Sequence, residues 1–202
     1  MMKTELFLDS GDAQSLLVVV DMVNGFINTG ALADPKINQI TPALVDTVKE
    51  YLDNSFPVIA FRDCHSENAK EFASFPPHCL KGTEESELID ELKPFASRFI
   101  DLEKNSTNGF VQPQFLDTFN SLKNIRSVMI VGCCTDICVL QFALGLKGYI
   151  NQNDLDIEMI VPKNQVATFD APGHNASEFD KWSLTLMANA GIRVIDECNW
   201  ED

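Results

Sequence analysis

The sequence predicts an α/β protein: a single three-layer α/β/α domain in which a mostly parallel sheet of six strands lies between two layers of helices. One observation is that short apolar runs, rich in β-branched residues, alternate with longer segments in which apolar residues recur every three or four positions. This alternation is typical of βαβ units. A second observation is that the runs are apolar at successive positions, as in strands covered on both faces. The chain has 202 residues and no repeat or linker, so we expect one domain over residues 1–202.

The predicted strands are the six apolar runs, of which L-L-V-V-V at 16–20 is the clearest. They cover residues 16–20, 57–61, 97–102, 128–131, 157–161 and 192–195. The predicted helices lie between these runs, where the apolar spacing is helical. They cover residues 41–51 (with Pro42 in the first turn), the acidic stretch 84–92, then 113–122, 135–148 and 176–190, the last with Trp182, Leu184, Leu186 and Met187 facing the core.

The stretch from 128 to 148 joins a strand to a helix with almost no loop. Gly132 closes the strand, and Thr135 or Asp136 is placed to cap the helix. Cys138 then lies in the first helical turn, where free backbone N–H groups and the helix dipole favour a thiolate. Cysteine is also among the most buried residue types, so Cys138 taken alone is better explained as a core residue than as a catalytic one.

Polar residues follow other predicted strands at the corresponding place. Asp21, Asp63 and Lys104 each lie at or just beyond the carboxyl end of a run. Because these ends meet at one edge of a parallel sheet, we expect all three side chains near Cys138. A carboxylate that takes the thiol proton, a thiolate that attacks a carbonyl and a lysine that balances their charges can together carry out covalent acyl chemistry.

A second cluster has the composition of a metal site. Asp63-x-His65 and His78, thirteen residues later, offer oxygen and imidazole ligands suited to zinc or another first-row divalent metal. Glu71 is a possible fourth ligand, directly or through water, and Glu67 competes with it. By contrast, His174 in D-A-P-G-H is expected at a helix entry or on the surface, and Cys64, Cys79 and Cys198 are expected to be structural.

Composition limits the classes of partner. The formal net charge is −15, from 30 acidic and 15 basic residues, which disfavours nucleic acid and anionic membranes. The apolar runs are shorter than a membrane span and no secretion signal is visible, so we expect a cytoplasmic protein whose six cysteines are free thiols. No G-x-G-x-x-G follows the first strand and no P-loop is present, which disfavours dinucleotides and nucleoside triphosphates as ligands. The expected partner is therefore another kind of small molecule.

Four segments resemble the isochorismatase-like cysteine hydrolases, and among them the nicotinamidases. They are V-V-V-D-M-V-N-G-F, D-C-H with F-P-P-H-C-L-K-G-T, K-N-S-T-N-G-F and G-C-C-T-D-I-C-V, in a resemblance that runs from residue 16 to about 195. The resemblance implies that Asp21, Lys104 and Cys138 are catalytic. It also implies a metal bound by Asp63, His65, His78 and Glu71, with zinc first and manganese or iron as alternatives.

The resemblance implies further details of the site. The peptide between Cys133 and Cys134 would be cis, the N–H groups of Cys134 and Cys138 would form an oxyanion hole, and Phe26 and Phe110 would contact substrate. This chain differs from many nicotinamidases in having Gly25, where they carry an acid, and Ser-Glu-Asn-Ala at 66–69, where they carry a second histidine.

The implied activity is hydrolysis of nicotinamide, or of a similar heteroaromatic amide such as pyrazinamide, to the acid and ammonia through a thioester. The resemblance also implies a homo-oligomer. Two alternatives remain: a metal-free relative acting on another amide, a carbamoyl group or an enol ether, and a non-catalytic protein that keeps the fold.

Overall fold

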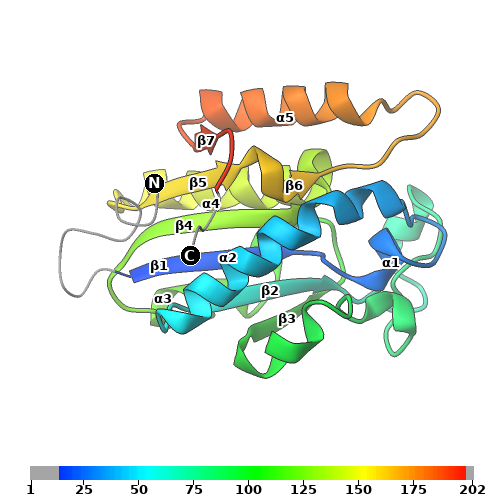
Figure 1. The fold of residues 1–202 in the computed structure, drawn as a ribbon, viewed down its shortest axis with the longest axis horizontal. Helices are drawn as coiled ribbons and strands as arrows, with labels where there is room; N and C mark the ends of the chain where they lie inside the picture. The colour runs from blue at the N-terminus through cyan, green and yellow to red at the C-terminus, as the bar shows by residue number, and fades with distance from the viewer. Residues whose placement is uncertain (1–13, 199–202) are drawn as a thin grey trace.

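A seven-stranded sheet runs through the centre of the protein, in a computed structural model that describes residues 14–198 (Figure 1). The strand order is β3-β2-β1-β4-β5-β7, with β6 paired to β4, and the pairings between these strands are parallel. The predicted boundaries at residues 1 and 202 lie outside the described residues. The strands are β1 (Gln14–Val20), β2 (Val58–Asp63), β3 (Ile100–Lys104), β4 (Ile125–Cys133), β5 (Glu158–Pro162), β6 (Val166–Ala167) and β7 (Arg193–Ile195).

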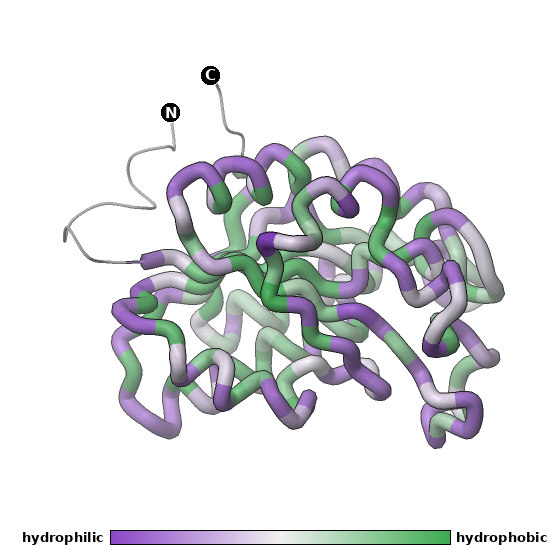
Figure 2. The backbone as a smooth tube through the Cα atoms, turned by 90° about the horizontal axis from the view of Figure 1, so that it is seen from below, coloured by the Kyte–Doolittle hydropathy of each residue, from purple (hydrophilic) through white to green (hydrophobic). Residues whose placement is uncertain are grey.

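Helices cover both faces of the sheet, as the alternating pattern predicts (Figure 1). They are α1 (Asn24–Ile27), α2 (Thr41–Asp53), α3 (Phe115–Ser121), α4 (Leu140–Gln152) and α5 (Ala176–Asn189). Leu17 and Val19 of β1 pack in the same core cluster as α2. Leu16, Val18 and Val20 point to the other face and pack in the cluster that holds α3 and α4. Figure 2 shows the result, with hydrophobic strands inside and more polar segments outside.

The predicted strand at 97–102 is displaced towards the carboxyl end. Residues Lys93–Arg98 form a 3-10 turn, and β3 begins at Ile100 and ends at Lys104. β3 is an edge strand whose side chains alternate between exposed and buried, so the continuous apolar run that marks the central strands is missing here. The prediction also missed β6, which has only two residues.

The predicted acidic helix at 84–92 is wrong. Only Glu84–Ser86 form a single 3-10 turn. Leu88 instead forms an isolated bridge with Val23, and the N–H of Ile89 donates to the carbonyl of Met22 at 3.1 Å. The apolar residues of this segment are used in tertiary contacts with the chain that leaves β1, and these contacts override its helical spacing.

Two other helices differ from the prediction. The helix expected from residue 135 begins as a wider π-turn, Thr135–Val139, and becomes regular only at α4. In α5, Met187 is buried as expected, but Trp182 and Leu186 are 65% and 51% exposed. Among residues 14–198, no helix is both long enough and apolar enough to cross a membrane.

Candidate active site

Three side chains at strand ends converge on the π-turn that follows β4. Asp21 directly follows β1, Asp63 ends β2 and Lys104 ends β3, where the register pairs Asp63 with Lys104. Because β2 lies between β3 and β1, and β4 lies next to β1, these three side chains come together beside Cys138. The structure thus brings together the side chains that the strand-end argument selected.

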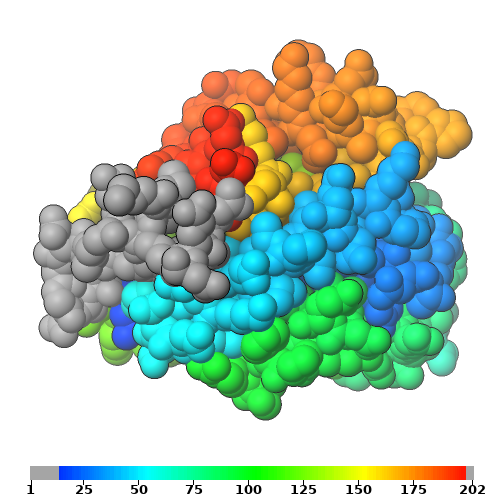
Figure 3. Space-filling model, viewed as in Figure 1, coloured from blue at the N-terminus to red at the C-terminus, as the bar shows by residue number. Residues whose placement is uncertain are grey.

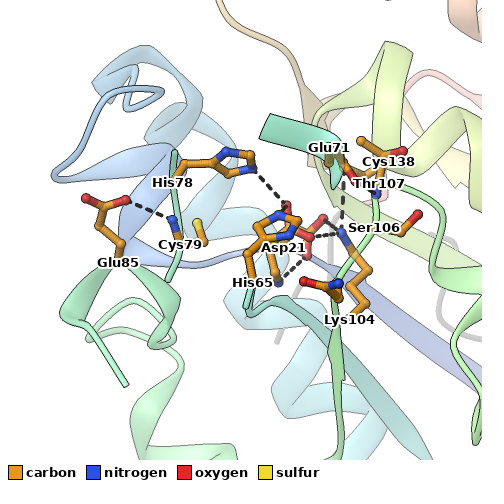
Figure 4. A network of polar contacts seen from close by, with 12 residues as sticks. Asp21, His65, Glu71, His78, Cys79, Glu85, Lys104, Ser106, Thr107 and Cys138 are labelled. Atoms are coloured by element: carbon orange, nitrogen blue, oxygen red, sulfur yellow. Dashed lines mark hydrogen bonds and ion pairs between the residues drawn. The ribbon is translucent and has the colours of Figure 1, made fainter. Parts of the chain in front are cut away.

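Lys104 is the centre of this cluster (Figure 4). Its Nζ lies 2.7 Å from Oδ2 of Asp21 and 3.8 Å from Sγ of Cys138. Nζ also forms an ion pair with Oδ1 of Asp63. All four side chains are almost completely buried. A buried ammonium between two carboxylates and a thiol is electrostatically balanced only while the groups stay together.

The backbone at the end of β1 holds Asp21 in place. The N–H of Asp63 donates to Oδ1 of Asp21 at 2.9 Å, and the Cys133 thiol donates to the Asp21 carbonyl at 3.2 Å. At Gly132, where φ is +115°, an added Cβ would lie 2.0 Å from the carbonyl oxygen of Val20. Only glycine lets β4 pass this close to β1, so the residue that closes the predicted strand also positions the site.

Burial and charge set the protonation states of these groups. Burial, together with the neighbouring Asp63 carboxylate, raises the pKa of Asp21 from 3.8 to about 7, against the opposing effect of Lys104. Burial alone would raise the pKa of Asp63, but the Lys104 charge and the two histidine contacts outweigh it and lower that pKa.

Burial likewise raises the pKa of the Cys138 thiol well above its usual value, although Lys104 acts in the opposite direction. The expectation that a helix terminus alone favours a thiolate is therefore corrected. Cys138 rests as a thiol beside Asp21, whose pKa near neutrality suits a group that accepts a proton.

Asp63, His65 and His78 form a compact group in which the ligand atoms lie within 4.8 Å of one another. Nε2 of His65 and Nε2 of His78 lie 3.5 and 3.6 Å from Oδ2 of Asp63, too far for good hydrogen bonds. Oδ2 of Asp63 and both ring nitrogens of His65 are buried without a hydrogen-bond partner. Buried polar atoms without partners are costly, and a cation between them would satisfy them.

The orientation of His78 also fits a metal site. Its Nδ1 lies 2.8 Å from the carbonyl of Pro76, which leaves Nε2 directed at Asp63. Metal-bound histidines commonly use their second nitrogen in this way. The residues present therefore fit a metal ion.

Of the two glutamates considered as further ligands, Glu71 faces the cavity beside this group, whereas Glu67 is exposed. Oε2 of Glu71 accepts a hydrogen bond from the N–H of Thr107 at 3.0 Å, while Oε1 is buried without a hydrogen-bond partner. Glu71 is not part of the compact group formed by the other three residues.

A cavity of about 220 Å³ opens onto Cys138, Asp63 and His78. Its walls are largely apolar and come from segments far apart in the chain: Phe26, Leu32, Phe75, Ile137 and Phe169. Phe26 thus lies where substrate contact was expected. Phe110 does not line the cavity. It packs against Phe115 and Tyr149 and over Gly145, where an added Cβ would lie 2.9 Å from its ring.

Two loops, one carrying Asp34 and the other carrying Asp170, meet beside the cavity that both residues line. Nζ of Lys36 lies 3.0 Å from Oδ2 of Asp170, and the N–H of Asp170 donates to Oδ2 of Asp34 at 3.0 Å. In Figure 3 the segment after α1, in light blue, lies against the segment before α5, in yellow-orange. These residues lie in loops, where the sequence carries no periodic signal that could have predicted them.

The turn that carries Cys138 has the implied backbone form. The peptide between Cys133 and Cys134 is cis. The carbonyl of Cys134 accepts hydrogen bonds from the N–H groups of Ile137 and Val139, both at 3.1 Å. Cys134 and Cys138 both line the cavity, so an oxygen placed beside Cys138 would lie next to this turn.

The structure accounts for Gly25, the position at which many nicotinamidases carry an acid. An added Cβ would lie 2.4 Å from Sγ of Cys79 and 3.0 Å from the carbonyl of Glu85. The N–H of Cys79 in turn donates to Oε2 of Glu85 at 2.9 Å. The loop that carries Cys79 thus fills the space that an acidic side chain would need.

All six cysteines are free thiols, as expected, and all six are buried.

Known proteins that are similar to this chain in sequence or in structure include nicotinamidases and another amidase. The chain is 36% identical to Nicotinamidase 1 of Arabidopsis thaliana over an alignment of 183 residues. This alignment covers 83% of this chain and 75% of that protein. The crystal structure of nicotinamidase PncA from Bacillus subtilis aligns with a TM-score of 0.77 and 26% identity over 91% of this chain and 99% of that one. N-carbamoylsarcosine amidase from Thermoplasma acidophilum aligns with a TM-score of 0.73 and 28% identity over 93% and 99% of the two chains.

The isochorismatase domain family matches residues 15–197, which is nearly all of the part that the structure describes. With this match and the 36% identity to a curated relative, the chain belongs to the isochorismatase family.

Proposed function

We propose that this protein is a metal-dependent cysteine amidohydrolase that converts nicotinamide, or a similar heteroaromatic amide such as pyrazinamide, to the acid and ammonia. The observation that carries the proposal is the position of Lys104 between Asp21 and Cys138, next to the buried group of Asp63 and two histidines. The names of the relatives, two of which are nicotinamidases, support the same conclusion.

The first half of the reaction forms a thioester. Asp21 accepts the proton of the Cys138 thiol, and the sulfur attacks the amide carbon. The N–H groups of Cys134 and Cys138 stabilise the oxyanion that develops. Asp21 then gives the proton to the departing nitrogen, so ammonia leaves and the acyl group remains on sulfur.

The second half releases the acid. Asp21, again ionised, takes a proton from a water molecule that attacks the thioester carbon. The carbon–sulfur bond breaks, the carboxylic acid leaves and the Cys138 sulfur takes the proton from Asp21, which restores the thiol and the Asp21 carboxylate. Lys104 keeps its charge throughout, because Asp21 and Asp63 raise its pKa despite its burial, and it stabilises whichever of Asp21 and Cys138 is negative.

Asp63, His65 and His78 would hold a divalent metal, with Glu71 as a further ligand, directly or through water. Zinc is the first choice for this set of nitrogen and oxygen donors, and manganese or iron are the alternatives. When bound, such an ion would supply Lewis acidity beside the cavity, which would favour a substrate with a ring nitrogen. The walls formed by Phe26, Phe75 and Phe169 suit a flat ring.

The test is ammonia release from purified protein with nicotinamide, pyrazinamide, benzamide and an N-carbamoyl amino acid as substrates. We expect turnover of the first two, much less of benzamide because it lacks a ring nitrogen, and loss of activity after chelation that added zinc restores. Metal analysis of the same preparation gives the identity of the ion. Equal rates with benzamide and nicotinamide, before and after chelation, would refute the metal's role.

A carbamoyl substrate is the second candidate, favoured by the likeness to the N-carbamoylsarcosine amidase from Thermoplasma acidophilum. The same substrate panel separates the two candidates. The further proposals are a cytoplasmic homo-oligomer, whose assembly the family resemblance implies, and one domain over residues 1–202, which the length of the chain favours. Light scattering measures the first, and limited proteolysis of the full chain tests the second.

A further inference from the structure

His174 lies within a stack of three rings. The centroid of its imidazole lies 4.0 Å from the ring centroid of Phe169, at an interplanar angle of 3°. On the other face, it lies 3.8 Å from the ring centroid of Phe179. The segment that carries it runs from β6 to the start of α5 (Figure 1). His174 therefore lies at the entry to α5, one of the two placements that the sequence predicted, and its side chain is packed and only 15% exposed.

Both ring nitrogens of His174 are also in polar contacts. Nδ1 lies 2.9 Å from the carbonyl oxygen of Phe169, and Nε2 lies 2.8 Å from Oδ2 of Asp136. The ring is thus fixed on two faces and at two edges. A surface histidine needs none of these contacts.

The carboxylate of Asp136 connects this ring to the nucleophile. Asp136 lies in the π-turn Thr135–Val139, two residues before Cys138. Its Oδ1 accepts a hydrogen bond from Oγ1 of Thr168 at 2.5 Å, while Oδ2 contacts His174. Both carboxylate oxygens are therefore held by the segment that follows β6.

The same segment forms one wall of the cavity. Phe169, Asp170 and Ala171 line it, and the nucleophile turn lines it through Ile137 and Cys138. His174 stacks on Phe169, which forms the aromatic wall of the cavity on this side, and it also contacts Asp136. It therefore joins this aromatic wall to the π-turn that carries Cys138. The separation of wall and turn decides where the carbonyl carbon of a bound ring amide lies relative to Sγ.

We propose that Asp136 and His174 form a positioning pair that holds the Cys138 turn at a fixed distance from the aromatic wall of the substrate cavity. Neither residue takes part in proton transfer to substrate. The proposal rests on the proposed amidohydrolase function only in taking Cys138 as the nucleophile. It adds specificity determinants for a flat, ring-bearing amide, since a change in this spacing affects such a substrate more than a small aliphatic amide.

The test compares His174→Phe, His174→Gln and Asp136→Asn with the parent protein. His174→Phe keeps an aromatic ring in the stack but removes both hydrogen bonds. Because small misplacement of a nucleophile is costly, we expect kcat on nicotinamide to fall about 10- to 100-fold with a much smaller change in KM. His174→Gln restores an N–H donor towards Asp136 and should recover part of kcat. The loss on acetamide should be smaller than the loss on nicotinamide.

The double variant Asp136→Asn with His174→Phe gives a stricter measurement. Since both single changes alter the same contact, the double variant should lose no more activity than the worse single variant. Losses that multiply would overturn the pairing. So would wild-type kcat in a folded His174→Phe protein.

Asn175→Ala is the matched control for stability. Its side chain accepts a hydrogen bond from the N–H of Glu178 and caps α5 in the same segment, without contacting Asp136. It should lower Tm without changing kcat. If His174→Phe does not fold, His174→Gln and Asp136→Asn carry the test through the same kcat and KM comparison.

A second readout does not depend on the substrate. The rate at which iodoacetamide alkylates Cys138, followed by mass spectrometry, should change in His174→Phe and Asp136→Asn but not in Asn175→Ala. If the parent protein hydrolyses no amide, the proposed function fails while the alkylation rates still decide the positioning pair. Identical alkylation rates in all four proteins would refute it.

Discussion

The two ends of β1 both bury polar side chains, but in different ways. At its start, the Ser15 hydroxyl lies 2.8 Å from the hydroxyl of Tyr51 and accepts a hydrogen bond from Ser127 at 2.7 Å. At its end, Asp21 lies among charged groups, and next to it Oδ2 of Asp63 is buried without a hydrogen-bond partner. The first cluster is neutral and hydrogen-bonded, while the second is charged and incompletely paired.

This difference separates structure from chemistry. A neutral hydrogen-bonded cluster adds modestly to stability and has no capacity left for a ligand. A charged cluster with unpaired atoms is costly to bury, and it persists where those atoms serve a ligand or a reaction. The comparison predicts that changes at the end of β1 affect activity and changes at its start affect only stability.

The largest effect is expected from Cys138→Ala. Because it removes the nucleophile, it should lower turnover of nicotinamide on the order of 10⁴-fold or more. The metal content should stay that of the parent, since the Asp63 group is intact. Cys198→Ala, at another buried thiol, is the control. Ammonia release with more than a tenth of the parent rate would break the comparison.

Lys104→Met should lower both activity and stability. It removes the ammonium that two buried carboxylates share, and breaking a buried pair in this way costs about 3–5 kcal/mol of unfolding free energy. Without that charge, kcat should fall about 10²- to 10³-fold. Urea unfolding and steady-state kinetics measure the two effects. A variant that gains stability and keeps its activity would contradict the electrostatic account of the cluster.

Glu71→Gln and Glu67→Gln form a matched pair. Oε1 of Glu71 is buried, and Glu71 lines the same cavity as Asp63 and His78, whereas Glu67 is exposed. We expect Glu71→Gln to weaken the affinity for zinc about 10- to 100-fold, because the loss of groups that contact a metal site or orient its ligands has effects of this size. Glu67→Gln should leave it unchanged. Competition with a chromophoric chelator measures both affinities, and a reversed order would reassign the ligand.

The pH dependence of Cys138 alkylation tests Asp21 as the proton acceptor. Burial and the Asp63 carboxylate raise the pKa of Asp21 to about 7, so Asp21 is protonated below that pH and ionised above it. In chelated protein the alkylation rate should therefore rise as pH increases through about 7, by up to about tenfold per pH unit below the midpoint. Asp21→Asn should remove this inflection, and an unchanged profile in that variant would exclude Asp21 as the base.

The smallest effect on activity is expected from Ser15→Ala. It leaves the Tyr51 and Ser127 hydroxyls without this partner and should cost about 1–3 kcal/mol of unfolding free energy. The site lies about 20 Å away along β1, so kcat and KM should not change. Reduced kcat at full folding would show that the two ends of the strand are coupled.

The sequence determined the central strands, the two-sided helical layers and the group of side chains at the strand ends. The reason is that successive apolar residues in 16–20 and 128–131 can only be buried on both faces, and parallel strands deliver Asp21, Asp63 and Lys104 to the same edge. The spacing of His65 and His78 was likewise enough to suggest a metal site.

Only the tertiary structure decided how those groups act on one another. Whether Cys138 rests as a thiol depends on burial and on the distances to Lys104 and Asp21, which no local pattern encodes. The contact of His174 with Asp136 joins residues 38 positions apart, and the cavity walls come from loops without periodicity. Local sequence sets which residues are available at each strand end, whereas electrostatics and packing depend on neighbours that are distant in the chain.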